Sequence, residues 1–410
     1  MMNNNIMRAS ERSCSGCGAC VVICPKKAVQ LKLDAAGFWV ADVQEQACVQ
    51  CGLCRRVCNR YEEYKGHSSL YDSRLYALQS SSRETVKGCS SGGAAHELAL
   101  QAMRKNYKAV GAVYNLDTNQ VMHEIVDNDE NILCLDGSKY LQSNPVSAFF
   151  EAVSEARADK KSCFYVFGTP CQIAGMDKVL RHYKIRNQFL LIEIFCHGVP
   201  SYKLWEITCS KIAKRLGTNR FDSVLFRYKK NDWHTYCLKV EANGKKYYGA
   251  RETELFWQVF FENILLGDAC FECQVRRENT SADLRIGDYW GTRFQNHADG
   301  VSAVFACSCQ GEKAIEELID EKRFRVLKKS DVSDMLAAQN MSGYTQKRLH
   351  ADAMKVLRKS GNIDDAVRYY RCRMPGKQKL KRIFLQVSAI IPDGIRSRLR
   401  KANSSRILRK

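Results

Sequence analysis

Alternating apolar and polar residues predict a short hairpin near the start of the chain. Residues 29–33 and 38–43 alternate in this way around a turn at 34–37, which predicts two antiparallel strands. Further along, continuous apolar runs alternate with helical patterns. This is typical of strands that are buried on both faces of a partly parallel sheet. We predict strands at 74–79, 109–115, 121–126, 163–167 and 189–195, and helices at 94–105, 146–158, 173–183 and 204–216.

The pattern changes after residue 220. Three antiparallel strands are predicted at 221–228, 236–241 and 245–248, because Asn243-Gly244 favours a two-residue hairpin. A helix at 254–266, strands at 283–291 and 301–307, and a helical, polar and finally basic stretch follow. We therefore predict an α/β protein with a small N-terminal module at 1–65, a mixed-sheet domain in two parts at 66–150 and 151–315, and a helical extension with a basic tail at 316–410.

Eight cysteines in two matched runs dominate the N-terminal module. Each run has the spacing C-x2-C-x2-C-x3-C, which is the bacterial-ferredoxin pattern for 4Fe-4S clusters. The fourth cysteine of each run ligates the other cluster. The predicted sets are Cys14, Cys17, Cys20 and Cys58 for cluster one, and Cys48, Cys51, Cys54 and Cys24 for cluster two. Asn59 stands where the first run has Pro25, and we expect it to loosen that loop slightly. Two zinc sites are the alternative, but zinc is usually bound by C-x2-4-C pairs.

The chain has 410 residues and 20 cysteines, a number that could indicate a secreted disulfide protein. The polar stretch at 1–10 lacks the apolar run of a signal peptide, and ferredoxin thiolates need a reducing compartment. No apolar run is long enough to span a bilayer. We therefore expect a cytoplasmic protein.

The net charge of +20 is concentrated at the C-terminus. Residues 376–410 hold eleven Lys or Arg and one acid, Asp393, for a net charge of +10 (11 − 1). A basic amphipathic segment of this kind can lie on the inner membrane face, dock an acidic partner or stay solvated. We do not expect a nucleic-acid partner, because the predicted loops do not interleave basic and aromatic residues.

Three further features carry candidate chemistry. The turn at 88–93 (GCSSGG) feeds a helix, which suits either a phosphate or a plain N-cap. The polar loop at 137–143 (GSKYLQS) precedes the helix at 146–158. Cys171 and Cys196 each follow a buried strand, and Cys270 and Cys273 form a C-x-x-C pair, so these four thiols are a candidate third metal site. Core cysteines and a redox-active pair are the alternatives.

These loops resemble the beta subunit of coenzyme F420-reducing hydrogenase and the related F420-dependent dehydrogenases. The motifs GTPCQ at 168–172, CHGVPS at 196–201, GSKYLQS at 137–143 and IGDYWG at 286–291 occur in that family's order, and the resemblance covers about residues 66–315. It implies an FAD-binding α/β domain with a 4Fe-4S cluster held by Cys171, Cys196, Cys270 and Cys273. It also implies flavin contacts from Ser91, Gly92, Gly93, Ser138, Lys139, Tyr140 and Gln142. Asp288, beside Gly287, is a further candidate for a hydrogen bond to a flavin hydroxyl, and the capping of a turn is the alternative.

The resemblance implies an iron–sulfur flavoprotein oxidoreductase. Electrons from a ferredoxin or a partner subunit are expected to pass through the clusters to FAD and on to a small organic acceptor, either a deazaflavin such as coenzyme F420 or another metabolite. Lys139 is the candidate for stabilising reduced flavin and His197 for donating a proton, while a solvated loop lysine and a loop-holding histidine are the alternatives. An electron-transfer subunit without its own substrate and a reductase of a surface-polysaccharide pathway remain open.

Overall fold

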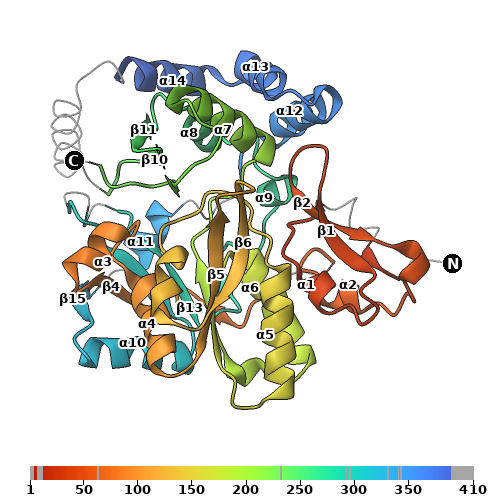
Figure 1. Ribbon diagram of the computed structural model, residues 1–410, viewed down its shortest axis with the longest axis vertical. Helices are drawn as coiled ribbons and strands as arrows, with labels where there is room; N and C mark the ends of the chain where they lie inside the picture. Colours follow the sequence, from red (N-terminus) through yellow and green to blue (C-terminus); the bar gives the residue numbers. More distant parts are fainter. Residues whose placement is uncertain are drawn as a thin grey trace.

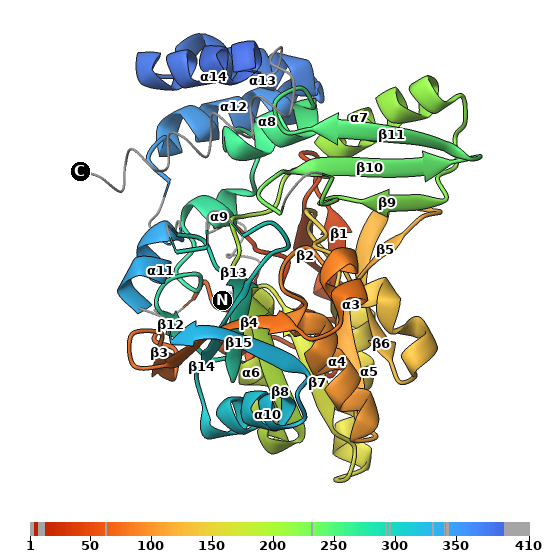
Figure 2. The same cartoon turned by 90° about the vertical axis from the view of Figure 1, so that its left-hand side faces the viewer.

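The computed structural model describes residues 4–6, 13–61, 64–230, 233–291, 293–294, 297–329, 332–339, 341 and 344–388. A small N-terminal module lies beside a large mixed sheet, and a lobe of helices with a second sheet lies above both (Figure 1). The turned view shows the second sheet, β9–β11, between the central sheet below it and the helices α13 and α14 above it (Figure 2). The fold is therefore α/β with a ferredoxin-like module in front, as predicted.

The N-terminal module is built on the predicted hairpin. β1 (Val29–Leu33) pairs antiparallel with β2 (Trp39–Val43), and Val29 lies opposite Val43. Two short helices, α1 (Ala19–Val22) and α2 (Leu53–Val57), begin after Gly18 and Gly52. Both glycines have positive φ, 77° and 79°, a conformation that costs glycine little, so the chain can turn sharply inside each cysteine run.

The central sheet has eight strands in the order β15-β4-β14-β13-β8-β7-β5-β6. Its middle strands β13, β8, β7 and β5 are mutually parallel, and the outer pairings are antiparallel. The bounds are β4 (Arg74–Ser80), β5 (Lys108–Asn115), β6 (Gln120–Val126), β7 (Phe164–Gly168), β8 (Phe189–Ile194), β13 (Leu284–Asp288), β14 (Ser302–Ala306) and β15 (Phe324–Lys329). The strands have few exposed side chains because helices cover both faces of the sheet.

Helices α4 (Ala94–Arg104) and α10 (Cys309–Asp320) pack on one face of this sheet, and α5 (Val146–Ala158) and α6 (Pro170–His182) pack on the other. Shorter elements complete this part of the chain: α3 (Arg83–Gly88), η3 (Asp129–Leu135), η4 (Arg186–Gln188), α9 (Asp268–Phe271), α11 (Val332–Ala338), and the small pair β3 (Ser68–Ser69) and β12 (Asn279–Thr280). The apolar sides of α5 and α6 also contact α1 and α2, so one core joins the module to the sheet.

The upper lobe has its own core. The sheet β11-β10-β9 is antiparallel and is formed by β9 (Ser223–Leu225), β10 (Cys237–Ala242) and β11 (Lys245–Ala250). It packs with α7 (Tyr202–Leu216), α8 (Leu255–Phe261), α12 (Lys347–Ser360) and α13 (Ile363–Arg373). The buried side chains of Trp205, Phe256 and Trp257 lie at its centre.

Several predicted elements were wrong in their extent. The strand expected at 221–228 is only Ser223–Leu225. The helix expected at 173–183 begins at Pro170, because Thr169 and Gln172 form a capping box and proline is favoured in a first helical turn. The helix expected at 254–266 ends at Phe261. The extension after 315 is not wholly helical, because β15 adds an edge strand to the central sheet beside β4.

The described part of the basic tail is one helix, α14 (Gly376–Ser388). It exposes Leu380, Ile383 and Phe384, whose side chains are 69%, 54% and 71% exposed. The rest of the predicted tail, 389–410, lies outside the described residues. Within the described part of the chain, every helix is too short or too polar to cross a membrane. Contact of the tail with a membrane or an acidic partner stays a prediction.

The N-terminal module is fixed to the large domain by side chains from loops that lie far apart in the sequence. Gln142 accepts a hydrogen bond from the Trp39 amide at 2.7 Å and donates to the carbonyls of Ser15 and Trp39 at 3.0 Å. Asn59 is buried and donates from Nδ2 to the Cys171 carbonyl at 3.0 Å. The residue that replaces the expected proline therefore anchors the second cysteine run to the start of α6.

Gly175 allows α6 to approach the module closely. A Cβ atom at this position would lie 2.9 Å from Ala19 Cβ and 3.2 Å from Cys17 Sγ. We expect Gly175→Leu to push α1 away from α6 and to destabilise this contact by about 1–3 kcal/mol, as overpacking of a core does. Faster limited proteolysis after residue 61, together with a lower thermal midpoint, would measure the effect.

Gly88→Leu is the matched control, because a Cβ atom at Gly88 has no neighbour within 4 Å. It should leave proteolysis and the thermal midpoint close to those of the unaltered chain. If Gly175→Leu behaves like Gly88→Leu, the contact between α6 and α1 does not hold the module in place.

Candidate functional site

Parallel pairing of β7 and β8 brings two candidate ligands to one edge of the sheet. The two strands are neighbours, with Phe164 opposite Phe189. Cys171 lies in the first turn of α6, directly after β7, and Cys196 follows the end of β8. The thiols therefore lie at the carboxyl ends of adjacent parallel strands, where open α/β sheets place their ligands.

The C-x-x-C pair is brought to this edge by pairing between two loops. The Gly267 amide donates to the Val199 carbonyl at 2.9 Å, and the Ser201 amide donates to Leu265 at 3.0 Å. Gly198 fits between them with a φ of +139°, and a Cβ atom there would lie 3.4 Å from Cys270 Cβ. The glycine of the CHG motif thus leaves room for Cys270 beside Cys196.

The four thiols are close enough to interact electrostatically. Burial raises the pKa of Cys171 to about 11, and the neighbouring Cys273 contributes to this rise. Burial and then Cys273 raise the pKa of Cys270 to about 12. Burial also raises the pKa of Cys196, with added repulsion from the other three. The structure thus brings together all four members of the predicted third set.

The eight N-terminal cysteines fall into the two crossed groups. Burial raises the pKa of Cys20, and the thiols that add to this include Cys17, Cys14 and Cys58. For Cys54, burial is again the main cause of a raised pKa, and the thiols that add to it are Cys24 and Cys48. Each fourth cysteine therefore lies with the other run, which is the arrangement of ligands in two-cluster ferredoxins.

Cys17 connects the module to the third set. Burial raises its pKa, and among its thiol neighbours the largest effect comes from Cys171, ahead of Cys58 and Cys14. Cys51, in the other crossed group, is exposed. The three sulfur sets thus form a series that runs from the exposed Cys51 through the module to the edge of the central sheet.

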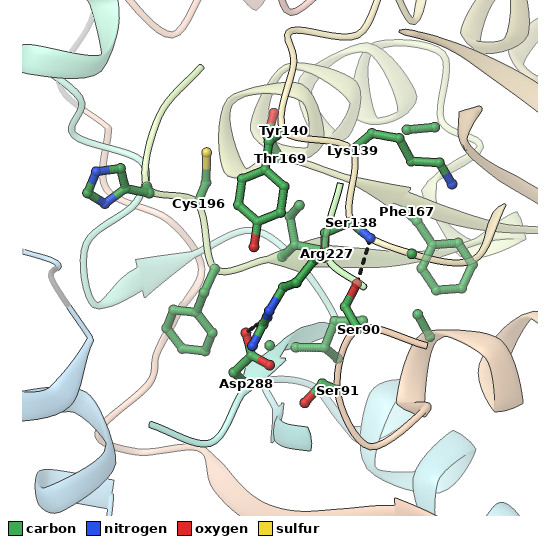
Figure 3. A pocket seen from close by; sticks show the side chains of 18 of the residues that line it. Ser90, Ser91, Ser138, Lys139, Tyr140, Phe167, Thr169, Cys196, Arg227 and Asp288 are labelled. Carbon is green, nitrogen blue, oxygen red and sulfur yellow. Dashed lines mark hydrogen bonds and ion pairs between the residues drawn. The ribbon is translucent and has the colours of Figure 1, made fainter. Parts of the chain in front are cut away.

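A cavity of about 450 Å³ opens at the Cys196 end of this series. Its wall includes residues from all five motifs: the turn after α3, the loop at 137–143, the GTPCQ and CHGVPS loops, and the end of β13. Figure 3 shows Ser90, Ser138 and Cys196 around this space, together with the Ser138 amide that donates to Ser90 Oγ at 2.9 Å. Motifs that lie far apart in the sequence therefore share one site.

The Lys139 side chain fixes the loop that carries it. Its Nζ atom donates to the carbonyls of Cys134 and Asp136, both at 2.8 Å, and points away from Arg227 and Asp288 (Figure 3). Burial lowers the pKa of Lys139 to about 8. The ammonium group lines the cavity, but two of its three N–H groups donate to main-chain carbonyls. Only the third N–H group is left for the predicted contact with reduced flavin.

His197 lines the cavity with its ring against Phe260 and Tyr344. Its Nε2 atom lies 2.6 Å from Asn263 Oδ1, and burial lowers its pKa to about 4. At neutral pH the ring is therefore neutral, and Nε2 donates to the Asn263 amide oxygen. The His197 carbonyl accepts from Arg276 and Tyr344. This arrangement favours the loop-holding alternative over the predicted proton donor.

The other predicted flavin contacts divide into two groups. Ser91, Gly93, Ser138, Tyr140 and Asp288 line the cavity. Gly92 and Gln142 do not. A Cβ atom at Gly92 would lie 2.4 Å from the Leu78 carbonyl, so Gly92 packs against the sheet, and Gln142 holds the N-terminal module.

Arg227 is the most prominent site residue that no motif indicates, and it lies before β10. It is buried, pairs with Asp288 at 2.5 Å and donates to the Trp233 carbonyl at 2.7 Å. Its guanidinium lies over the rings of Tyr236 and Trp290. Arg227 Nε and Asp288 Oδ1 are buried without a hydrogen-bond partner among the described residues. This wall thus offers aromatic faces together with a charge pair.

His123 on β6 is a second residue that the motifs do not indicate. It is 3% exposed and lines the cavity, and its Nε2 atom lies 3.0 Å from the Phe167 carbonyl. Burial lowers its pKa to about 4. Nδ1 is left unprotonated, and it has no partner within the part of the chain that the structure describes.

Comparison with known proteins gives two family matches. Residues 162–332 match the family of the C-terminal part of coenzyme F420 hydrogenase/dehydrogenase beta subunits, and residues 13–60 match the 4Fe-4S dicluster domain. The first match contains the GTPCQ, CHGVPS, C-x-x-C and IGDYWG motifs, and the second contains all eight N-terminal cysteines. The family resemblance predicted from the motifs is confirmed.

Two individual proteins are also similar to this chain. An uncharacterized protein of Methanocaldococcus jannaschii, MJ1349, is 26% identical over 263 residues, which covers 55% of this chain and 68% of that protein. A chain of the F420-reducing [NiFe] hydrogenase complex from Methanosarcina barkeri is 17% identical, with a TM-score of 0.49, and the match covers 74% of this chain and 97% of that chain.

Proposed function

We propose that this chain, whose residues 13–60 match a 4Fe-4S dicluster domain and whose residues 162–332 match the C-terminal domain of coenzyme F420 hydrogenase/dehydrogenase beta subunits, is an iron–sulfur oxidoreductase. It takes single electrons from a ferredoxin or a partner subunit at the N-terminal clusters and delivers them, through a third cluster and FAD, to a small organic acceptor. Coenzyme F420 or a similar deazaflavin is one such acceptor.

The observation that carries this proposal is the series of three sulfur sets that ends at a cavity. Cys51 is exposed and lies near the exposed side chains of Arg55 and Arg56 in the chain, which suits an acidic electron donor. At the other end Cys196 is part of the cavity wall. A series of this kind has an input at the protein surface and an output at a ligand site.

The residues around the cavity fit a flavin nucleotide by their chemistry. The turn at 90–93 supplies Ser90 and Ser91 and leads into α4, whose N-cap residue Gly93 has no capping side chain, so this helix N-terminus suits a phosphate. Tyr140, Tyr236 and Trp290 supply aromatic surface, and Arg227 supplies a buried positive charge. When bound, FAD would convert between one-electron and two-electron transfer, and the protein would supply placement and electrostatics.

The test is anaerobic purification followed by iron, sulfide and flavin analysis of the unaltered chain and of Ser138→Trp. Ser138 is exposed toward the cavity, so an indole there would occupy the space that we assign to flavin. We expect about twelve iron atoms and one flavin in the unaltered chain. Ser138→Trp should keep its iron but bind flavin at least about tenfold more weakly, since overpacking costs about 1–3 kcal/mol.

Ser210→Trp is the matched control, because Ser210 is exposed on α7 and does not line the cavity. It should bind flavin as the unaltered chain does. Purified protein with full iron but no affinity for any flavin would contradict the proposal. That result would favour the second candidate, an electron-transfer subunit without its own substrate, which the continuous sulfur series also supports.

A further inference from the structure

Three side chains of different chemistry meet at one end of the cavity, and no role has yet been given to any of them. They are the Cys89 thiol, the His96 imidazole and the Asp136 carboxylate, and their ligand atoms all lie within 4.8 Å of one another. Cys89 and His96 are each 8% exposed, and all three residues line the cavity. They come from three elements: the end of α3, the first turn of α4, and the residue after η3.

The Gly-rich turn at 88–93 is what brings the thiol and the imidazole together. Gly93 has a φ of +89° and lets the chain reverse between Cys89 and the start of α4, so that His96 returns toward the thiol. The Oδ1 and Oδ2 atoms of Asp136 lie 3.0 and 2.9 Å from His96 Nδ1. It also interacts with the Cys89 side chain. The carboxylate therefore bridges the other two groups.

We propose that Cys89, His96 and Asp136 bind a divalent zinc ion. Thiolate sulfur, imidazole nitrogen and carboxylate oxygen are the ligand types of zinc, and three protein ligands leave a fourth position open, as in catalytic zinc sites. Zinc bonds of about 2.0–2.3 Å place ligand atoms roughly 3.3–3.8 Å apart in a tetrahedron. His96 Nδ1 and the Asp136 oxygens lie slightly closer together than this, and all the ligand atoms lie within 4.8 Å of one another, so small side-chain shifts would bring the group to that size. The open position faces the cavity, where the ion would polarise an oxygen atom of the bound molecule.

The surrounding charges are compatible with a bound cation. A thiolate and a carboxylate together balance the charge of a divalent ion. Two ammonium groups interact with the Cys89 thiol, and both are held by main-chain carbonyls. Lys139 donates to Cys134 and Asp136, and Lys229 donates to Val86, Ser91 and Asp299 at 2.6–2.7 Å. Neither lysine is therefore needed as the counter-ion of Cys89 or Asp136.

The site is distinct from the cysteine sets in both place and ligand type. It has one sulfur ligand, whereas the third set has four, so the two sites differ in the coordination that X-ray absorption at the zinc edge detects. Zinc binding also has a readout that does not involve flavin. A result that the chain binds no zinc can therefore be distinguished from a result that it binds no flavin.

The experiment uses the anaerobically purified full chain, given one equivalent of zinc and then passed through a desalting column. We expect about one zinc per chain, with one sulfur at about 2.3 Å and nitrogen or oxygen at about 2.0–2.2 Å in the zinc-edge spectrum. Cys89→Ser and His96→Gln should each weaken zinc binding at least about 100-fold, since even outer partners of metal ligands are worth 10–100-fold. The iron content of both variants should be unchanged.

Cys309→Ser is the control, because Cys309 is exposed at the start of α10 and does not line the cavity. It should bind zinc like the unaltered chain. The proposal is overturned if the unaltered chain holds no zinc, if its zinc has four sulfur ligands, or if Cys89→Ser and His96→Gln bind zinc as tightly as the unaltered chain. Unchanged iron content in both variants shows that they are folded, so a loss of zinc is assigned to the site.

Discussion

Cys171→Ala is expected to purify with about eight iron atoms instead of about twelve and to lose electron delivery to any acceptor in the cavity. Cys171 is half-buried and lies between Cys17 and the other three thiols of the third set. Its replacement removes one of four ligands from that set and also interrupts the series between the module and Cys196. The eight N-terminal cysteines are untouched, so their clusters should remain reducible.

Iron and sulfide analysis would measure the loss, and low-temperature electron paramagnetic resonance of the reduced protein would show which clusters remain. Cys209→Ala is the control, because Cys209 is a buried cysteine of α7 that lies in the core of the upper lobe. It should keep all the iron and full activity. Unchanged iron in Cys171→Ala would exclude the third cluster, and unchanged electron delivery would exclude the proposed order of transfer.

The hydrophobic pattern predicts most strands and helices of the central sheet to within a few residues. The helix predicted at 146–158 has the bounds that the structure shows. Placing Cys171 and Cys196 at one edge requires only that β7 and β8 be parallel neighbours, since both strands are followed directly by their motif loops. Local patterns are sufficient here because the strand ends determine where the side chains lie.

Residues that act across long separations are not predictable from such patterns. Gln142 belongs to a motif that suggests flavin, yet its side chain bonds to residues 103 and 127 positions earlier. Asn59 looks like a small defect in a cysteine run, yet it bonds to Cys171, 112 residues further on. A single sequence gives the chemistry of such side chains but not the partner that tertiary packing brings to them.

Arg227 illustrates the same limit for the cavity wall. It lies between two short strands of the upper lobe, in a basic stretch that resembles a solvated surface, and it becomes buried only when this lobe packs over the carboxyl ends of the central sheet. His96 and Asp136 are similar, because their contact depends on how the loop at 129–137 returns to α4. The motifs thus predict where the site lies, and the fold adds the charged groups within it.

The side chain of Arg285 holds the C-x-x-C loop in place, and its replacement should have the largest effect on the stability of the protein. Arg285 on β13 lies opposite Glu193 on β8, and both side chains are fully buried. The guanidinium pairs with Glu193 and donates to the carbonyls of Val275, Arg277 and Asn279. These carbonyls belong to the segment that follows Cys273, so one side chain joins the sheet to the third cysteine set.

We expect Arg285→Met to lower the free energy of unfolding by about 3–5 kcal/mol, because it leaves a buried carboxylate without its partner. The thermal midpoint and urea unfolding under anaerobic conditions would measure this. Arg74→Met is the control. Arg74 forms exposed ion pairs with Glu312 and Glu316, and surface pairs are worth only about 0–1 kcal/mol. Equal midpoints for the two variants would contradict the assigned role of Arg285.

The pH dependence of Arg285→Met follows from Glu193. Burial raises the pKa of this carboxyl even with Arg285 present, and the loss of the guanidinium should raise it further. A carboxyl whose pKa is higher in the folded state than in the unfolded state favours folding at low pH, and that contribution is lost as the pH rises through the folded-state pKa. The stability deficit of Arg285→Met should therefore be smallest at acidic pH and should grow as the pH rises.

Replacing Glu193 with leucine in the same chain should remove the pH dependence and recover part of the stability, because no lone charge remains buried. A deficit that is constant with pH would mean that the lost carbonyl contacts, and not the unpaired carboxylate, account for the effect.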